Sequence, residues 1–308
     1  MTTRRAILKS TVGALGGLSL PPFARVGFAA DKPGVTRVTD KLALLTGAGG
    51  NVLALSTSDG TVLVDSGAAE FTDALLATLG ELPGGGRVRT LFNTHWHLDQ
   101  VGSNEAIGRA GATIIAHEKT RLRLATDYYL PAEDRYQKAL PAEAQPTETF
   151  YTSGEMTVDN ERIEYGYLLE AHTDGDIYVF FRSSNVLAVG DAVSAVRDPV
   201  LDWFGGGWLG GRVDSLAMLL EISDDRTQFV PSYGPVVGRA EVQAEHDMML
   251  VLFERMVELV RKGQSAEDIL AGGVMDGLGR SFADPLKFVH DAHKGLWAHH
   301  NTLSPDVV

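Results

Sequence analysis

The sequence contains no cysteine in its 308 residues. A chain without thiols forms no disulfides, offers no thiolate to a metal ion and has no cysteine nucleophile. A lipid anchor of the lipoprotein type is excluded as well, because it is attached through a cysteine. Any metal site in this chain must therefore be built without sulfur from cysteine.

The chain also lacks long apolar runs and an excess of positive charge. No segment approaches the ~18 consecutive apolar residues of a membrane-spanning helix, and no internal repeat of solenoid length is visible. The formal net charge of -13 argues against nucleic acid or an anionic membrane as a partner. Hydrophobic residues make up 44% and charged residues 22%, which is ordinary for a globular protein. We expect a small-molecule partner.

The N-terminus has the layout of a secretory signal, with a basic start, a weakly apolar middle and a small-residue end. Arg4 and Arg5, followed by an apolar pair and Lys9, resemble the twin-arginine export signal. We predict a signal peptide over residues 1–29, cut after Ala29, and a periplasmic or secreted mature protein without a membrane anchor. A cytosolic leader is the alternative. Residues 30–308 show no linker and are predicted to form a single domain.

Strand and helix patterns alternate along the mature chain. The β-rich runs at 52–57 and 61–65 flank Ser58-Asp59-Gly60, a hairpin signal. Further strands are predicted at 88–93, 112–116, 163–169, 177–182, 186–189 and 228–231. Helices are predicted at 69–82, 104–110, 119–124 and 241–262, with two shorter ones after them, and WFGGGWLGG at 203–211 is predicted to be a flexible loop. This interleaving favours an α/β layered fold with buried sheets.

Residues 94–100 read THWHLDQ and directly follow a predicted buried strand. Side chains at alternate positions of an extended segment point the same way, so His95, His97 and Asp99 can converge on one point. Imidazole nitrogens bind zinc, and three protein ligands plus a water form the usual open catalytic arrangement. The spacing therefore predicts a metal site.

Four motifs together resemble the metallo-β-lactamase superfamily: THWHLDQ, AHTDGD at 171–176, VGD at 189–191 and SYGPV at 232–236. The family pattern opens H-x-H-x-D-H. NVLALSTSDGTVLVDSG at 51–67 also resembles the opening hairpin of the family. The similarity extends over essentially the whole mature chain. It implies an α/β fold of four layers, an αββα sandwich, with the site along one edge of the sheets.

The resemblance also implies a set of metal ligands. His95, His97 and His172 correspond to the three nitrogens of the first metal site, and Asp191 corresponds to the carboxylate shared between two metals. We expect this first site to bind Zn²⁺.

The second metal site of the family is incomplete in this chain. Asp99 is kept, but Gln100 and Tyr233 stand where histidines are expected. A glutamine carbonyl ligates zinc weakly, and a phenol must first lose a proton with a pKa of about 10. We expect one tightly held zinc ion per chain, with a second position that Asp99 and Gln100 fill weakly or not at all. The alternative is that Gln100 still coordinates and two ions bind.

The expected activity is that of an exported metallo-hydrolase. Zinc lowers the pKa of its bound water to about 7 and supplies hydroxide to attack a lactone, cyclic amide or ester-like substrate. Asp99 is the candidate to orient that water or accept its proton. Tyr233 is the candidate to donate a hydrogen bond to the oxyanion or the leaving group, unless it merely packs.

Two other functions stay open. His95, His172 and Asp191 could form the two-histidine, one-carboxylate face of a mononuclear iron oxygenase, as in the persulfide dioxygenase of this superfamily, although His97 would then be idle. A non-catalytic, ligand-binding member of the family is the other alternative.

The remaining polar and aromatic residues are interpreted as structural. His117 is predicted to be structural, Asp174 and Asp176 to shape the turn before His172, and Asp65 to support the ligands indirectly. The C-terminal histidines are predicted to lie on the surface: His290, His293, His299 and His300. The aromatic residues of the glycine-rich loop are either a lid over the site or packing residues: Trp203, Phe204 and Trp208.

Overall fold

The computed structural model describes residues 32–130, 134–194 and 196–299. The predicted signal peptide at 1–29 lies outside these residues, as does His300. Within the described residues, no helix is both long enough and apolar enough to cross a bilayer.

The first large sheet has seven strands in the order β1-β2-β3-β4-β5-β6-β9. Strands β1 to β4 pair antiparallel, and β4, β5, β6 and β9 pair parallel. The bounds are β1 Gly34–Arg37, β2 Leu42–Ala48, β3 Gly50–Thr57, β4 Gly60–Val64, β5 Val88–Phe92, β6 Thr113–His117 and β9 Glu148–Phe150.

The second large sheet has five strands in the order β10-β11-β12-β13-β14. The first four pair antiparallel, and β13 pairs parallel with β14 across a helical crossover, as parallel strands require. Its strands are β10 Ser153–Val158, β11 Glu161–Tyr167, β12 Ile177–Phe181, β13 Val186–Gly190 and β14 Gln228–Pro231. A separate hairpin joins β7 Tyr128–Leu130 to β8 Arg135–Gln137.

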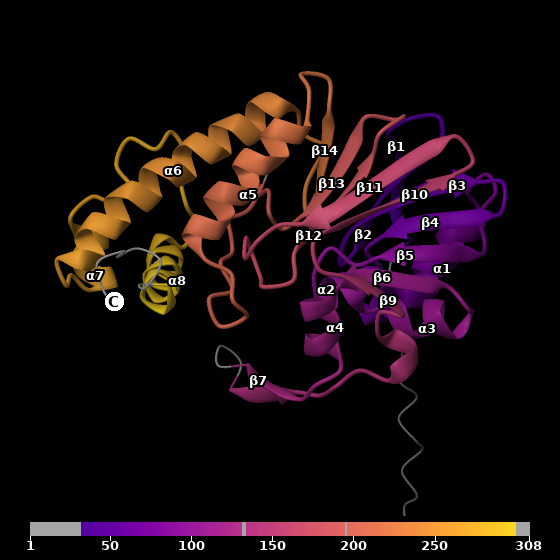
Figure 1. Ribbon diagram of the computed structural model, residues 1–308, viewed down its shortest axis with the longest axis horizontal. Coiled ribbons are helices and arrows are strands. Elements are labelled where there is room, and N and C mark those ends of the chain that lie inside the picture. Colours follow the sequence, from indigo (N-terminus) through magenta and orange to yellow (C-terminus); the bar gives the residue numbers. More distant parts are fainter. Residues whose placement is uncertain (1–31, 131–133, 195, 300–308) are drawn as a thin grey trace, which may run out of the picture.

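Helices cover the outer faces of the two sheets (Figure 1). The first sheet is covered by η1 Ala69–Phe71, α1 Thr72–Gly80 and α3 Asn104–Arg109, and the second by α5 Leu209–Ile222, α6 Arg239–Arg261, α7 Ala266–Ala271 and α8 Pro285–Ala298. The short helices α2 Leu98–Val101, α4 Glu118–Leu124 and η3 Ala142–Ala144 lie in the connections.

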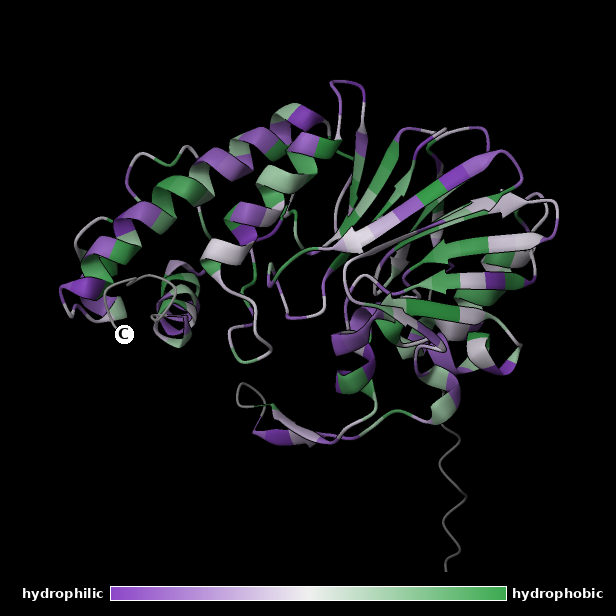
Figure 2. Cartoon of the chain, in the orientation of Figure 1, coloured by the Kyte–Doolittle hydropathy of each residue, from purple (hydrophilic) through white to green (hydrophobic). Residues whose placement is uncertain are grey.

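Three apolar cores separate these four layers. Strand β3 shows how they form, because its successive side chains point to opposite faces of the sheet. Leu53 and Leu55 pack into the core between the two sheets, whereas Val52 and Ala54 pack into the core under α1 and α3. A third core lies between the second sheet and helices α5, α6 and α8. Figure 2 shows hydrophobic residues along the central strands and a mixed pattern on α6. The αββα sandwich is confirmed.

The elements predicted from the sequence are present, most within two residues of their predicted ends. One prediction is wrong: the glycine-rich run at 203–211 is not all loop, because α5 begins at Leu209. A Cβ atom on Gly211 would lie 2.3 Å from the carbonyl oxygen of Glu170, so this glycine serves close packing. Helix α5 itself and strands β1, β2 and β7 to β10 had no clear sequence signal.

Candidate metal centre

His95 and His97 lie in the connection that follows β5. The chain is still extended at His97, with φ -65° and ψ 143°, so these two alternate side chains face the same way. Helix α2 begins at Leu98, and the alternation ends there. Asp99 does not belong to the group of ligand atoms found among the described residues, and its part in a weak second site stays a prediction.

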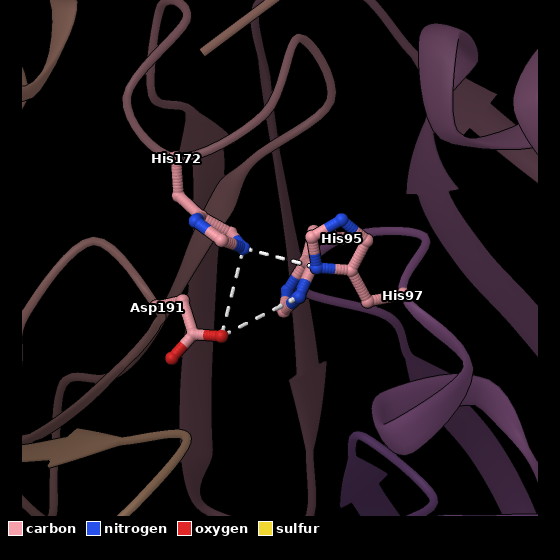
Figure 3. Close-up of side chains that lie close together, drawn as sticks. All are labelled: His95, His97, His172 and Asp191. Carbon is pink, nitrogen blue, oxygen red and sulfur yellow. Dashed lines mark hydrogen bonds and ion pairs between the residues drawn. The ribbon is translucent and has the colours of Figure 1, made fainter. Parts of the chain in front are cut away.

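The second sheet supplies the other two members of this group. His172 follows β11, and Asp191 directly follows β13. With His95 and His97 they offer ligand atoms that all lie within 4.8 Å of one another (Figure 3). His172 Nε2 is 3.1 Å from His97 Nδ1, and Asp191 Oδ2 is 3.7 Å from His95 Nε2 and 3.6 Å from His172 Nε2. The structure thus brings together the four residues predicted to form the first metal site.

A hydrogen bond on the far side of each ring fixes where its lone pair points. His172 Nδ1 lies 2.8 Å from the carbonyl oxygen of Val200, which only accepts, so this nitrogen carries the proton. His97 Nε2 lies 3.1 Å from Asp202 Oδ2 and likewise donates. This leaves His172 Nε2 and His97 Nδ1, which face each other 3.1 Å apart, as the nitrogens that would offer lone pairs to an ion when both rings are neutral.

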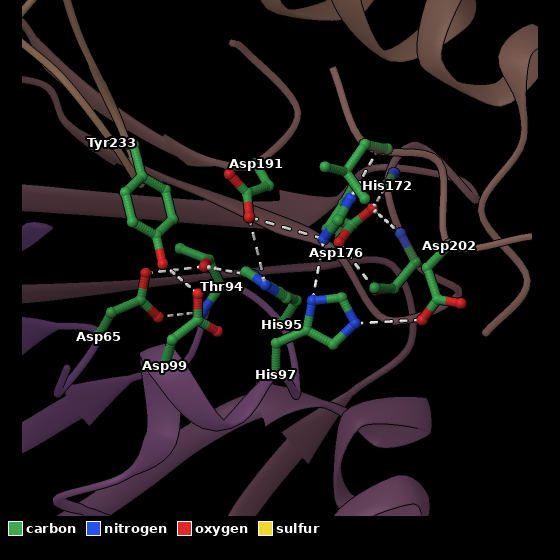
Figure 4. Close-up of polar contacts among 12 residues, drawn as sticks. Asp65, Thr94, His95, His97, Asp99, His172, Asp176, Asp191, Asp202 and Tyr233 are labelled. Atoms are coloured by element: carbon green, nitrogen blue, oxygen red, sulfur yellow. Dashed lines mark hydrogen bonds and ion pairs between the residues drawn. The ribbon is translucent and has the colours of Figure 1, made fainter. Parts of the chain in front are cut away.

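The tautomer of His95 follows from a chain of hydrogen bonds that runs from Asp65 through Thr94 to His95 (Figure 4). Thr94 Oγ1 donates its one proton to Asp65 Oδ2 over 2.7 Å. With the Asp65 carboxyl ionised, this hydroxyl has no second proton and can only accept from His95 Nδ1, 3.1 Å away. His95 Nε2 is left as a lone pair, buried and without a hydrogen-bond partner among the described residues.

These residues fit a metal ion. Three imidazole lone pairs converge beside a carboxylate, and a bound cation satisfies all of them at once. Nitrogen and carboxylate ligands suit zinc, and outer hydrogen bonds of this kind orient metal-binding histidines in many proteins. His95, His97, His172 and Asp191 would hold the ion.

The electrostatic setting keeps two of the rings neutral. Burial lowers the pKa of His95 well below its usual value, and the positive charges of His97 and Arg197 lower it further. Burial also lowers the pKa of His172 well below its usual value. Burial acts the same way on His97, but its hydrogen bond to Asp202 and the charge of Asp202 prevail and raise its pKa.

Two buried carboxyl groups support the ligands from outside. Burial raises the pKa of Asp65 to about 8, against hydrogen bonds from Thr94. Burial raises the pKa of Asp176 to about 7. Asp176 Oδ2 accepts from the backbone nitrogens of His172 and Thr173, 2.5 and 2.7 Å away, and so shapes the turn that carries His172. Asp174 instead pairs with Arg123.

The other candidate residues do not belong to this group of four. The Tyr233 hydroxyl donates a hydrogen bond to Asp99 Oδ2. Burial raises the pKa of Tyr233, and this hydrogen bond raises it further. The Gln100 side chain is fully buried, and its amide has no hydrogen-bond partner in the described part of the chain. Arg197 donates from Nη2 to Asp191 Oδ2 over 2.6 Å.

Sequence reasoning missed three residues of this site: Thr94, Arg197 and Asp202. Thr94 precedes the histidine motif, but nothing in the sequence marks it as the acceptor for His95. Arg197 and Asp202 belong to the connection between β13 and α5, where no periodic pattern places a side chain.

The residues set aside as structural have protein partners. His117 stacks on Tyr167 with ring centroids 3.9 Å apart, and its Nε2 lies 3.1 Å from the carbonyl oxygen of Tyr151. Not all C-terminal histidines lie on the surface, which corrects the prediction. His293 and His299 are partly buried and hydrogen-bonded, and His290 is exposed.

A cavity of about 670 Å³ opens beside His97 and Asp99. Its walls are largely aromatic and aliphatic, and Trp203 and Phe204 are among them. Trp208 does not line it but stacks on His299, with centroids 4.3 Å apart. Trp203 and Phe204 thus lie in the wall of the cavity beside His97, and Trp208 has a packing role.

The sequence matches the model of the metallo-beta-lactamase superfamily over residues 45–230. The chain belongs to this superfamily. A comparison with curated proteins finds no match.

Solved structures show the same fold. A metallo-beta-lactamase from Pontibacter korlensis is 22% identical with a TM-score of 0.58, over 71% of this chain and 99% of that one. The DIM-1 metallo-beta-lactamase is 17% identical with a TM-score of 0.57, over 71% of this chain and 97% of that one. The stereoselective inverting sec-alkylsulfatase Pisa1 from Pseudomonas sp. is 16% identical with a TM-score of 0.63. That match covers 90% of this chain and about half, 52%, of the sulfatase.

Proposed function

We propose that this protein is an exported metal-dependent hydrolase that binds one zinc ion and cleaves a lactone, cyclic amide or ester-like substrate. The observation that carries the proposal is the convergence of three imidazole lone pairs on Asp191, each set by a separate outer hydrogen bond. Because His97 takes part in this group, a two-histidine, one-carboxylate iron site leaves a converging ligand unused.

When bound, a zinc ion would supply a Lewis acid that lowers the pKa of water to about 7 and polarises a carbonyl group. His95, His97, His172 and Asp191 would hold it. The outer partners fix the rings before the ion arrives, so little reorganisation is needed on binding.

We assign to Asp99 the task of accepting the proton of the attacking water. It lines the same cavity as His97, so water and substrate can reach both side chains. The Tyr233 hydroxyl binds one of its carboxylate oxygens and holds the group in place. The raised pKa of Tyr233 keeps the phenol protonated, which suits a hydrogen-bond donor better than a metal ligand.

The cavity favours a substrate with a sizeable apolar part. Its volume of about 670 Å³ lies in the range of small-molecule sites, and apolar walls with a few polar groups are typical of them. Aromatic side chains offer flat apolar surfaces in the same cavity as His97: Trp96, Tyr128, Trp203 and Phe204.

A substrate panel tests the proposal. The full chain, freed of metal by a chelator and then reloaded with zinc, is assayed on lactones, cyclic amides and esters with short and long apolar groups. We expect hydrolysis that depends on zinc and is absent from His97→Ala. A protein that retains zinc yet cleaves no member of the panel contradicts the hydrolase proposal, and iron as isolated with oxygen uptake favours the oxygenase.

Export is a separate part of the proposal and rests on residues 1–29 alone. The full chain is expressed in a bacterium with a twin-arginine pathway, and the periplasmic fraction is examined by mass spectrometry. We expect a mature N-terminus near residue 30, and retention in the cytoplasm when Arg4→Lys and Arg5→Lys are combined. An uncut chain that stays in the cytoplasm contradicts export without bearing on hydrolysis.

A further inference from the structure

One carboxylate oxygen is approached from two sides. Asp191 Oδ2 lies 3.7 Å from His95 Nε2 and 3.6 Å from His172 Nε2, so it faces the position of the ion. The same oxygen accepts a hydrogen bond of 2.6 Å from Arg197 Nη2. The carboxylate is therefore placed between the metal position and a guanidinium group.

The aromatic ring of Tyr233 packs against that guanidinium group. Arg197 Cζ lies 3.6 Å from the centroid of the Tyr233 ring, a distance at which an aromatic face attracts a cation. The hydroxyl of the same ring donates to Asp99 Oδ2. A histidine at this position would offer a lone pair to a metal ion, whereas this tyrosine binds a protein cation with its face and a carboxylate with its edge.

The segment that carries Arg197 is anchored at its backbone. Arg280 donates to the carbonyl oxygen of Ser194 over 2.8 Å and also to the carbonyl oxygen of Arg197. Arg197 is thus held at its main chain by Arg280 and at its side chain by Asp191 and Tyr233. Its side chain is 35% exposed, so it sits at the rim of the site and not in the core.

We infer that the Arg197 guanidinium takes the place of a second metal ion: it neutralises the shared carboxylate Asp191 and limits the chain to one ion. This inference rests on the proposed metal site. A guanidinium group is permanently charged, so it repels a second divalent cation at every accessible pH. Arg197 is a positioning residue, because it acts on the site through Asp191.

Metal titration of four full-length proteins tests the inference, with calorimetry for the number of ions and the visible spectrum of Co²⁺ for their geometry. The wild-type protein is expected to bind one ion. Tyr233→His is expected to bind one as well, because Arg197 still occupies the position.

The variants without the guanidinium group are expected to gain a second ion. In Arg197→Ala the second ion binds weakly, because the chain offers it only oxygen ligands there. In the double variant Arg197→Ala with Tyr233→His it binds at least about tenfold more tightly, because a nitrogen ligand is added.

Two control variants show whether the number of bound ions depends on the positive charge at position 197 or on a general effect of losing an arginine. Arg197→Lys keeps a cation and is expected to stay at one ion. Arg226→Ala removes an exposed guanidinium group elsewhere, with a side chain that is 89% exposed, and is also expected to stay at one ion. Circular dichroism and the thermal unfolding midpoint show that each variant is folded.

A double variant that is folded and still binds one ion overturns the inference. So does a Tyr233→His protein that binds a second ion as tightly as the double variant. A wild-type protein with two tight ions overturns the inference while leaving hydrolysis intact, and a wild-type protein that binds no ion overturns the proposed function itself.

Discussion

The two sides of Asp191 are built in different ways. On the side that we call the imidazole side, His95, His97 and His172 present lone pairs, and each ring is fixed by its own outer partner. The guanidinium side consists of Asp99, Arg197 and Tyr233. Its polar groups bind one another or Asp191: Arg197 donates to Asp191, and Tyr233 donates to Asp99. The first side is prepared for an ion from outside, and the second already contains a positive charge.

This difference supports our proposal that the second metal site of the family is replaced here by protein contacts and not simply lost. Gln100 is fully buried, and its amide has no partner within the described residues, so it does not extend the hydrogen-bond network of the guanidinium side. Tyr233, in contrast, has taken on two contacts that a histidine ligand could not make together.

His97→Ala should have the largest effect, since it removes a direct ligand from the imidazole side. Loss of an outer partner alone typically costs ~10–100-fold in metal affinity, so loss of a ligand should cost more. We expect the metal to be lost on dialysis and hydrolysis to fall below detection. The matched control His246→Ala removes an imidazole from α6 and should retain the metal. Full zinc content in His97→Ala would exclude His97 as a ligand.

Asp99→Asn tests whether the carboxylate on the guanidinium side accepts a proton during hydrolysis. Asp99 lies outside the group of four ligands, so the metal content should not change. If Asp99 handles the proton of the attacking water, kcat should fall ~10²–10⁴-fold. The measurement is steady-state kinetics on protein of verified zinc content. An unchanged kcat would remove Asp99 from the mechanism.

Asp202→Ala tests whether the outer partners of the imidazole side matter. Asp202 Oδ2 lies 3.1 Å from His97 Nε2, and its loss frees that ring to rotate or change tautomer. We expect zinc affinity to fall ~10–100-fold, measured by competition with a chelating dye. Asp202→Asn keeps an oxygen that accepts from His97 and should lose less. Equal loss in the two variants would show that the charge matters and the orientation does not.

Trp203→Ala should have the smallest effect and should leave both sides of Asp191 intact. The side chain lines the cavity, so its removal should raise KM about tenfold for substrates with a long apolar group, in line with the burial energy of such a group. The kcat and the zinc content should stay constant. Trp297→Ala, which removes an exposed tryptophan on α8, is the control. A fall in kcat without a change in KM would contradict a substrate-binding role.

The sequence predicted the imidazole side well, because its residues belong to local motifs. His95 and His97 follow a buried strand at alternate positions, and His172 and Asp191 lie in motifs that resemble those of the family. A layered α/β fold was predictable because apolar runs such as Val52 to Leu55 in β3 alternate with helical patterns, and the four-layer arrangement followed from the resemblance to the family.

The guanidinium side could not be predicted from local patterns. Asp99 departs from the expected alternation because α2 begins at Leu98. Arg197 and Asp202 reach the site from an irregular connection, and their positions depend on contacts with Arg280, Tyr233 and His97 that are distant in sequence. Helix α5 was missed because Gly210 and Gly211 suggested a loop, whereas they permit close packing.

The most direct measurement is elemental analysis of the purified full-length protein, expressed as metal ions per chain after exhaustive dialysis. One zinc ion per chain is the predicted result, held by three imidazoles and Asp191. Two ions that both survive dialysis, or none at all, would contradict it.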